Sequence, residues 1–333
     1  MPWVIRDVVR DVNRSVARRW RSLDPLLPVP DDLPEGCSSP LVAAGPDGRP
    51  AALAVCRHQR VHDDSLNQTW GATHRFLLTP RIKPADTMPA LESILAQWGD
   101  HLVGIPASRD VDSAAIVTWP TRDVTGVRAL QRHGLIPMAV IAARPAARPA
   151  ARPAARPVGR GGRGGDADPA DLLIREAGPD DAAIVAELEM GVVRFDANFG
   201  GAVLRPATST LLRADVMLRL SRDPSWTFLA ERDGVPTGLV TVQPPREAGW
   251  LRPLTSVGRV AYLQTGFVVP GERGQGTGGR LVRHVHQLLD RSGVELTLLH
   301  YAQVNPLSGP FWSRLGYRPL WTIWEARPAA MLR

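Results

Sequence analysis

The chain has 333 residues, of which 44% are hydrophobic and 22% are charged, and its formal net charge is +7. This length allows two domains with a substantial core in each, and the composition is typical of a globular protein. No apolar run approaches the roughly 18 residues of a membrane-spanning helix, and no signal peptide is indicated, so we expect a cytoplasmic protein without a membrane partner. Cys37 and Cys56 are too few for a disulfide framework or a zinc site, and we predict no metal.

Much of the positive charge lies in one segment. Residues 144–168 hold six arginines and two aspartates, a net +4 of the total +7, which leaves +3 for the rest of the chain. Proline recurs there at every fourth position and is followed by glycine pairs, a pattern that opposes helices and sheet ladders. We therefore predict a flexible linker at 144–168 between a first domain, 1–143, and a second domain, 169–333.

The location of this charge argues against a nucleic-acid partner. Outside the linker, no basic helix or basic patch with interleaved aromatic residues stands out. A linker that binds nucleic acid or an acidic protein is a weaker alternative.

Apolar periodicity predicts the elements of the first half. Helical spacing indicates a helix over 2–20, and two short strands at 41–44 and 51–55 flank a Gly-Pro-Asp-Gly turn, as in a hairpin. The remaining predicted elements are helices at 88–102 and 124–134 and strands at 73–78, 114–119 and 137–142.

The second half begins with a predicted strand at 172–176. A Pro-Asp-Asp signal at 179–181 then predicts a helix through about Phe195. Further predicted elements are a helix at 210–220 and strands at 226–231, 237–242 and 260–269.

A glycine-rich turn at 271–279 joins the strand at 260–269 to an amphipathic helix. Glycines let the backbone approach an anion closely, and the free N–H groups at a helix start favour negative charge. A P-loop is excluded because its motif requires a lysine directly after the last glycine. The only lysine of the chain is Lys83, which lies far from this turn in the sequence. A dinucleotide-binding turn is formally matched by Gly274, Gly276 and Gly279, but it lacks the acidic residue expected about 20 positions later.

The remaining pattern is Val-Val-Pro followed by R-x-x-G-x-G, with Arg273, Gly276 and Gly278 at the defined positions. It resembles the acetyl-CoA loop of the GNAT N-acetyltransferase superfamily. Two downstream segments agree with this resemblance, because 298–305 resembles the family's fifth strand with its terminal asparagine, and 311–317 resembles its F-Y-x-K-x-G-F segment. The resemblance covers about residues 172–328 and implies acetyl-CoA as co-substrate.

The first half carries a trace of the same pattern. Residues 132–137 align with 314–319, each segment between a helix and a final strand that ends in Ala-Arg-Pro. The segment 79–84 contains no glycine, and its prolines lack N–H donors. We therefore predict an α+β protein with two GNAT-like domains, each a mixed, mainly antiparallel sheet flanked by helices, joined by the flexible linker. The N-terminal copy is degenerate, and the two copies are expected to pack as a pseudo-dimer within a monomer.

The resemblance implies a set of cofactor-binding residues. Backbone groups of Phe267, Val268 and Val269 would pair with the pantetheine arm, and Asn305 would contact the cofactor. The diphosphate would lie on Arg273, Gly274, Gln275, Gly276, Thr277, Gly278 and Gly279, and Phe311 and Trp312 would pack beside the cofactor.

The usual catalytic residues of the family are absent. Gln264 stands where a glutamate is common, and Trp312 stands where a tyrosine acid is common. A glutamine cannot accept a proton at neutral pH, and an indole does not ionise usefully. Tyr262 and Tyr301 are therefore the candidate proton donors, and with Gln264 they make up the predicted catalytic set. Glu187 and Glu189 are interpreted as solvated helix carboxylates.

These features predict an N-acetyltransferase that moves an acetyl group from acetyl-CoA to a primary amine of a small-molecule or peptide acceptor. The loop near 196–207 is expected to shape the acceptor pocket. A CoA-binding regulatory module without turnover is the alternative, because both usual acid–base positions are substituted.

Overall fold

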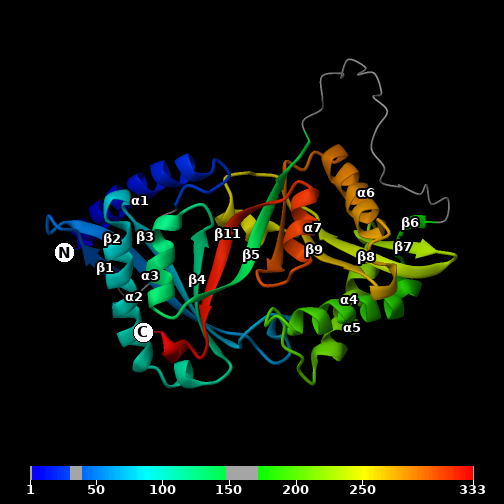
Figure 1. Cartoon of the computed structure of the whole chain (residues 1–333), viewed down its shortest axis with the longest axis horizontal. Helices are drawn as coiled ribbons and strands as arrows, with labels where there is room; N and C mark the ends of the chain where they lie inside the picture. The colour runs from blue at the N-terminus through cyan, green and yellow to red at the C-terminus, as the bar shows by residue number, and fades with distance from the viewer. Residues whose placement is uncertain (1, 31–39, 148–171, 333) are drawn as a thin grey trace, which may run out of the picture.

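The protein is built on one large sheet, shown by a computed structural model that describes residues 2–30, 40–147 and 172–332 (Figure 1). Within these ranges the sheet has eleven strands in the order β1-β2-β3-β4-β11-β5-β10-β9-β8-β7-β6. Most of the predicted linker lies outside the described residues. Its first two residues, Arg144 and Pro145, instead continue a strand of the sheet, so that strand ends three residues later than the predicted 137–142.

The predicted elements of the first half are present, with ends that shift by a few residues. In chain order they are α1 (Pro2–Leu23), β1 (Leu41–Ala44), β2 (Pro50–Arg60), the 3-10 helix η1 (Leu66–Thr69), β3 (His74–Ile82), α2 (Thr87–Val103), β4 (Ser113–Pro120), α3 (Val127–Arg132) and β5 (Ile136–Pro145).

The second half follows the predicted order as well. Its elements are β6 (Leu172–Glu176), α4 (Ala182–Ala197), α5 (Thr208–Leu220), β7 (Thr227–Arg232), β8 (Val235–Gln243), the 3-10 helix η6 (Gly249–Leu254), β9 (Val260–Val268), α6 (Thr277–Arg291), β10 (Leu296–Ala302), α7 (Ser308–Arg314) and β11 (Arg318–Ala326).

Each half has a hairpin that continues into a pair of parallel strands. In the first half β3 pairs parallel with β4, and α2 connects them; in the second half β9 pairs parallel with β10, and α6 connects them. The other pairings within each half are antiparallel, so the sheet is mixed and mainly antiparallel as predicted. The repeated order supports the interpretation of the first half as a second copy of the fold.

The final strands of the two halves are exchanged. Strand β11 pairs with β4 of the first half, β5 pairs with β10 of the second half, and β5 and β11 pair with each other. The two strands lie side by side at the centre of the molecule, green and red in Figure 1. The two halves therefore share one continuous sheet, a feature that periodicity did not predict.

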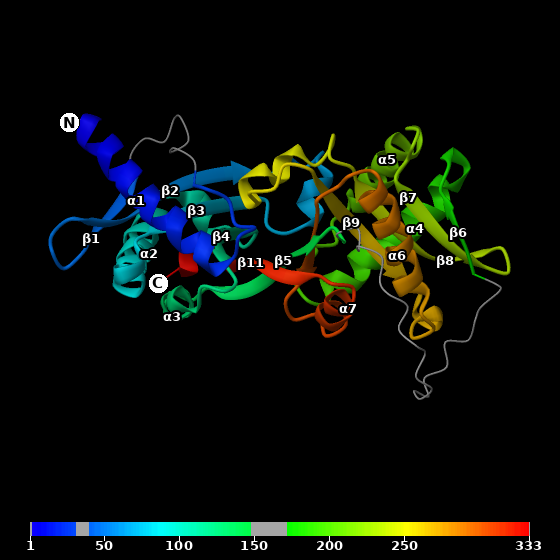
Figure 2. The same ribbon diagram turned by 90° about the horizontal axis from the view of Figure 1, so that it is seen from above.

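Helices cover both faces of this sheet (Figure 2). Helices α2, α3, α6 and α7 pack on one face, which we call the α6 face. Helices α1, α4 and α5, together with η6, pack on the opposite face, which we call the α4 face. Alternate residues of each strand point to these two layers, as the two-residue period of a strand requires.

Candidate functional site

Strands β9 and β10 are neighbours only at their beginnings. Three parallel pairs join them, from Val260 with Leu296 to Tyr262 with Leu298. Beyond these pairs β9 continues beside β8, and β10 continues beside β5. In the described sheet, the edge of β9 that faces β10 therefore has no strand partner from Leu263 onward, and Gly266 is exposed although it lies in a central strand. We call this opening the fork.

A bulge in β9 marks the start of the fork. Leu263 pairs with Val242 and Thr265 pairs with Thr241, so Gln264 is an extra residue between them. A bulge of this kind bends the strand and redirects a side chain. The Gln264 oxygen accepts a hydrogen bond of 3.0 Å from the amide nitrogen of Gln243, which brings Gln264 into a polar cluster on the α4 face.

The glycine-rich turn lies where β9 ends and α6 begins. Gly274 and Gly276 have φ angles of +81° and +82°, a conformation that residues with a Cβ atom rarely adopt. A Cβ atom placed at either glycine would meet no atom within 4 Å. Gly276 is also the N-cap of α6, and no side-chain hydrogen bond caps this helix, so its first N–H groups lack a side-chain acceptor. The turn has the properties of an anion cradle.

Thr277 supports this interpretation independently. It is the first residue of α6 and is only 1% exposed, and its hydroxyl has no hydrogen-bond partner in the described part of the structure. Leaving a buried polar group without a partner costs about 1–3 kcal/mol. An anion in the turn would supply the missing acceptor, so the hydroxyl, the glycines and the helix start together fit a diphosphate.

Two side chains that are predicted to bind the diphosphate instead form hydrogen bonds with backbone carbonyls in and beside the turn. The Nε atom of Arg273 donates to the Val268 carbonyl at 3.0 Å, and its guanidinium lies 4.8 Å from the ring centre of Phe195. Gln275 donates to the Gly271 carbonyl at 3.3 Å. In this conformation, anion binding is left to the backbone and to Thr277.

Phe311 and Trp312 pack beside the fork on the α6 face. A Cβ atom at Gly266 would lie 3.3 Å from the Trp312 ring, and one at Gly278 would lie 3.3 Å from the Phe311 ring. The two aromatic rings contact each other edge to face at 4.8 Å. These close approaches favour glycine at both positions and make the aromatic pair one wall of the fork.

Asn305 follows β10 and is 5% exposed. Its oxygen accepts a hydrogen bond from the Leu307 N–H at 3.0 Å, and its side chain hydrogen-bonds with Asp196 at the end of α4. Asn305, which is predicted to contact the cofactor, therefore connects the end of β10 to helix α4 in this structure.

Asp196 is a candidate residue that sequence reasoning missed. Burial raises the pKa of its carboxyl group to about 6, although the hydrogen bond with Asn305 offsets part of the rise. A Cβ atom at Gly201 would lie 3.3 Å from the Ala302 side chain and 3.7 Å from the Asp196 side chain, so this carboxylate lies near the free end of β10. No sequence pattern distinguishes it from the other acidic residues of its helix.

The other helix carboxylates have structural partners. Glu187 forms an exposed ion pair with Arg194 at 2.7 Å. Glu189 was expected to be solvated, but it is 3% exposed and pairs with the buried Arg219 at 2.7 Å. That expectation was wrong because the inward face of α4 packs against a sheet in which Thr241 also donates to Glu189.

The predicted catalytic residues Tyr262 and Gln264 belong to one cluster on the α4 face. The Tyr262 hydroxyl lies 3.0 Å from Nδ1 of His300, and the half-exposed Trp250 stands over both rings. The indole of Trp250 donates to Gln243 at 2.9 Å. Burial raises the pKa of Tyr262 and lowers the pKa of His300 to about 4, so both groups are uncharged near pH 7.

Tyr301, the third predicted catalytic residue, lies on the opposite side of the sheet. It packs with the core beneath α6, and a Cβ atom at Gly309 would lie 3.9 Å from its hydroxyl. Burial raises the pKa of this phenol, so it stays protonated at neutral pH. The structure therefore separates the two candidate tyrosines, one on each face of the fork.

The first half has a corresponding fork, and a side chain of the protein fills it. Strands β3 and β4 pair only up to Leu78 and Val117 and then separate. Arg19 of α1 reaches this region and donates to the hydroxyl of Thr87, to the buried Asp123 and to the Pro84 carbonyl. Thr87 begins α2 just as Thr277 begins α6, so a guanidinium stands where the second half leaves open space.

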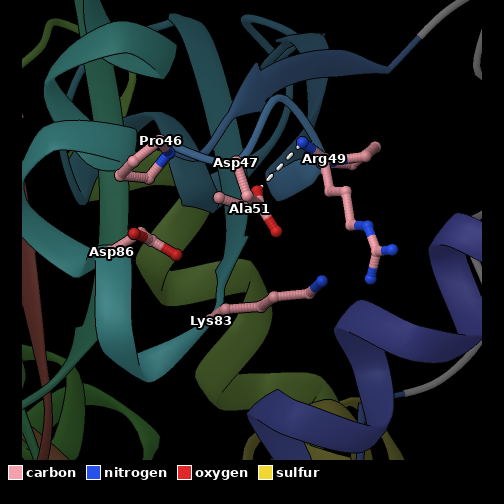
Figure 3. Close-up of a pocket in the computed structure, with 7 residues that line it drawn as sticks. Pro46, Asp47, Arg49, Ala51, Lys83 and Asp86 are labelled. Carbon is pink, nitrogen blue, oxygen red and sulfur yellow. Dashed lines mark hydrogen bonds between the residues drawn. The ribbon is translucent and has the colours of Figure 1, made fainter.

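A shallow cavity of about 240 Å³ in the first half has different chemistry (Figure 3). Its charged side chains are Asp47, Arg49, Lys83 and Asp86, two of each sign, so it offers no net charge to an anion. Lys83 also pairs with Asp11 of α1 at 2.7 Å. In the residues that the structure describes, no group of three or more His, Cys, Asp or Glu side chains is arranged to hold a metal ion.

The fork and its glycine-rich turn lie in the α+β second half of the molecule, where β9 ends and α6 begins. Residues 199–317, which include the fork, match the profile of the Acetyltransferase (GNAT) family. The chain therefore carries a domain of the GNAT family, and this family indicates acetyl transfer in general.

Solved structures agree on the fold. A GCN5-related N-acetyltransferase from Sphaerobacter thermophilus is 17% identical, with 89% of this chain and 82% of that chain covered and a TM-score of 0.52. A tandem GNAT protein from the clavulanic acid biosynthesis pathway is 16% identical, with 94% of this chain and 95% of that chain covered and a TM-score of 0.46. No curated protein sequence matches the chain.

Proposed function

We propose that the protein is an N-acetyltransferase that transfers the acetyl group of acetyl-CoA to a primary amine of a small-molecule or peptide acceptor. The observation that carries this proposal is the buried, unpartnered hydroxyl of Thr277 inside an open glycine turn at the end of the fork. The GNAT-family domain over the same region supports it.

The proposed cofactor site uses the predicted residues. The backbone of 274–279 and the Thr277 hydroxyl hold the diphosphate, and the edge of β9 that faces β10 pairs with the pantetheine arm near Val268. The predicted contribution of the Val269 N–H is not retained, because this group donates to the Thr237 carbonyl at 2.9 Å. Phe311 and Trp312 pack beside that arm. Holding two reactants in a productive orientation contributes on the order of 7–11 kcal/mol to lowering a barrier, so the fork itself is a major part of the proposed catalysis.

Asp196 is the residue that we assign to accept the proton of the amine. Its raised pKa, about 6, keeps the carboxylate ionised at pH 7 and above while leaving it more basic than an ordinary aspartate. It approaches the fork from the α4 face, the same face as Gln264 and Tyr262. Those two neutral groups are assigned to orient the amine by hydrogen bonds.

Tyr301 is assigned to return a proton on the other face. When bound, acetyl-CoA supplies the thioester carbon that the amine attacks; a C–N bond forms and the C–S bond breaks. The thiolate that leaves then takes the phenolic proton of Tyr301, whose raised pKa keeps it protonated until that step. Asp196 afterwards releases the amine proton to solvent, and the Tyr301 phenolate takes a proton from solvent, so both groups return to their starting states. The two proton transfers occur on opposite sides of the sheet.

The alternative is a CoA-binding regulatory module without turnover. It is favoured by Gln264 and Trp312, neither of which can act as the usual acid or base. Calorimetry with acetyl-CoA, followed by an assay of thiol release with a panel of primary amines, separates the two. Binding with thiol release supports the transferase, binding without release for every amine supports the module, and absence of binding contradicts both.

The cellular location and the state of assembly rest on composition and on the shared sheet. Among the helices within the described ranges, none is both long and apolar enough to traverse a bilayer. A cytoplasmic monomer, with the two halves packed as an internal pseudo-dimer and no nucleic-acid partner, stays a prediction. A solution mass of twice the 36.2 kDa chain would contradict the monomer.

A further inference from the structure

We propose that the first half of the chain holds the acceptor loop, residues 198–207, in its working position, and that Arg205 is the positioning residue. This inference rests on the proposed function and concerns the acceptor side of the same site. The loop contacts a segment of the first half that is more than 90 positions away in the chain.

The guanidinium of Arg205 binds three groups, all of which belong to the first half. Its Nε atom donates to the Gln68 carbonyl at 2.7 Å, and one terminal nitrogen donates to the Gly71 carbonyl at 3.1 Å and to the Asp112 carboxylate at 2.9 Å. The Arg205 side chain is 17% exposed. A planar guanidinium with several donors in fixed directions orients its neighbours more strictly than a flexible ammonium does.

The backbone of the loop is bound to the same segment. The Val203 N–H donates to the Thr69 carbonyl at 2.8 Å. The hydroxyls of Thr69 and Thr208 lie 3.3 Å apart and are both fully buried, and the Thr208 hydroxyl also accepts a bond from the Arg205 N–H at 3.1 Å. Helix η1 of the first half and the start of α5 therefore clamp the loop between them.

Asp112 is a fixed anchor for this clamp. Its carboxylate accepts a hydrogen bond from the Thr73 hydroxyl at 2.7 Å as well as from Arg205. Burial alone would raise its pKa, but the bonds from Arg205 and Thr73 outweigh burial and hold the pKa below its ordinary value. The carboxylate therefore stays ionised across the neutral pH range, and the clamp does not depend on pH there.

The other side of the loop meets the fork. The loop starts two residues after Asp196, and Gly201 packs against Ala302 at the end of β10. Gly200 packs against Met138 of β5, where a Cβ atom would lie 3.1 Å from the methionine methyl group. A displacement of the loop would therefore move the surroundings of Asp196. Arg19 closes the fork of the first half, whereas bracing this loop is a contribution to catalysis that needs no cofactor in the first half.

The test uses Arg205→Gln in the full chain, with Asp112→Asn as its partner. Hydrogen exchange of peptides from 198–207, the Kd for acetyl-CoA and the KM for the amine with the fastest thiol release are measured. We expect exchange of the loop to rise about 10-fold and the amine KM to rise about 10-fold, while the Kd for acetyl-CoA changes less than 2-fold. The double variant should be little worse than Arg205→Gln alone, because Arg205→Gln already removes the bond between Arg205 and Asp112.

Arg194→Gln is the matched control, since it breaks the exposed pair with Glu187 and leaves the clamp intact. Unchanged loop exchange and unchanged amine KM in Arg205→Gln would overturn the proposal. So would an exchange increase that is uniform over both halves, which is the result expected of a residue that only stabilises the fold. Arg205→Lys, which keeps the charge, should give intermediate values. If the wild-type chain fails to bind acetyl-CoA, the proposed function fails, whereas the exchange experiment still tests the clamp.

Discussion

Thr277 and Thr87 occupy equivalent positions at the start of α6 and α2, yet only the hydroxyl of Thr87 has hydrogen-bond partners in the described structure. Thr87 donates to the Pro84 carbonyl at 3.1 Å and accepts a bond from Arg19, whereas Thr277 is equally buried and unpaired. The threonine at this position has a structural role in the first half, whereas in the second half its hydroxyl is available for binding. This pair offers an internal control for the proposed cofactor site.

Replacement of each threonine by valine should therefore have opposite effects. Thr277→Val removes a buried hydroxyl without a partner, so the free energy of unfolding of the unliganded protein should stay the same or rise by up to about 1 kcal/mol. The Kd for acetyl-CoA should rise about 5- to 10-fold. Thr87→Val should lower the free energy of unfolding by about 1–2 kcal/mol and leave the Kd unchanged. Denaturant titration and calorimetry measure both; equal loss of stability in the two variants would contradict the assignment.

Gly276→Asp should abolish acetyl-CoA binding. The residue has a φ angle of +82°, which costs a residue with a Cβ atom roughly 1–2 kcal/mol, and the new carboxylate would repel the diphosphate. We expect the Kd to rise at least 100-fold in calorimetry. Gly258→Asp is the control, because it adds the same charge at a glycine with no neighbours within 4 Å and without a positive φ angle. Normal binding by Gly276→Asp would exclude the turn as the diphosphate site.

Asp196→Asn should remove the increase of kcat/KM with pH that is expected near pH 6. Because the pKa of Asp196 is raised to about 6, kcat/KM of the wild type should increase with pH through about 6 as the carboxylate ionises. The variant should lose this rise, and kcat should fall about 100-fold or more. Glu187→Gln, a change of an exposed carboxylate on the same helix, should leave the profile unaltered. A variant that retains the rise near pH 6 would show that another group accepts the proton.

The same variant should change the pH dependence of stability. The folded-state pKa of Asp196 is above its ordinary value of 3.8, so the folded protein binds the proton more tightly and loses stability as the pH rises from about 4 to about 6. Asp196→Asn should therefore be more stable than the wild type at pH 8, by on the order of 2 kcal/mol after allowance for partial solvation. Equal stability of the two proteins at pH 8 in urea titrations would contradict the buried charge.

Arg19→Met should destabilise the first half without affecting the cofactor. Asp123 is 2% exposed and pairs with Arg19, and removing one partner of a buried ion pair costs about 3–5 kcal/mol. The double variant Arg19→Met, Asp123→Leu should recover part of this loss because it also removes the buried charge. Unfolding titrations measure the stability, and the Kd for acetyl-CoA should be unchanged. A large increase in that Kd would indicate that the first half takes part in cofactor binding.

Local signals in the amino-acid sequence were sufficient to predict the helices and strands and the glycine-rich turn. Glycines in a turn indicate a backbone conformation that other residues rarely adopt. Apolar periodicity indicates which face of a helix or strand is buried. Both signals depend on neighbours in the chain, so the turn at 271–279 and the strand and helix that flank it were predictable before the structure was known.

The tertiary structure alone decided which groups surround the cradle and which strands complete the sheet. The alternation of inward-facing and outward-facing residues in β5 and β11 is the same whether each strand joins its own half or the other. The exchange of these strands therefore cannot be predicted from the local sequence. The pKa of Asp196, the closure of the first fork by Arg19 and the clamp on Arg205 all depend on burial and on partners far away in the chain. Such contacts exist only after the chain has folded, because desolvation and ion pairing are properties of positions in space.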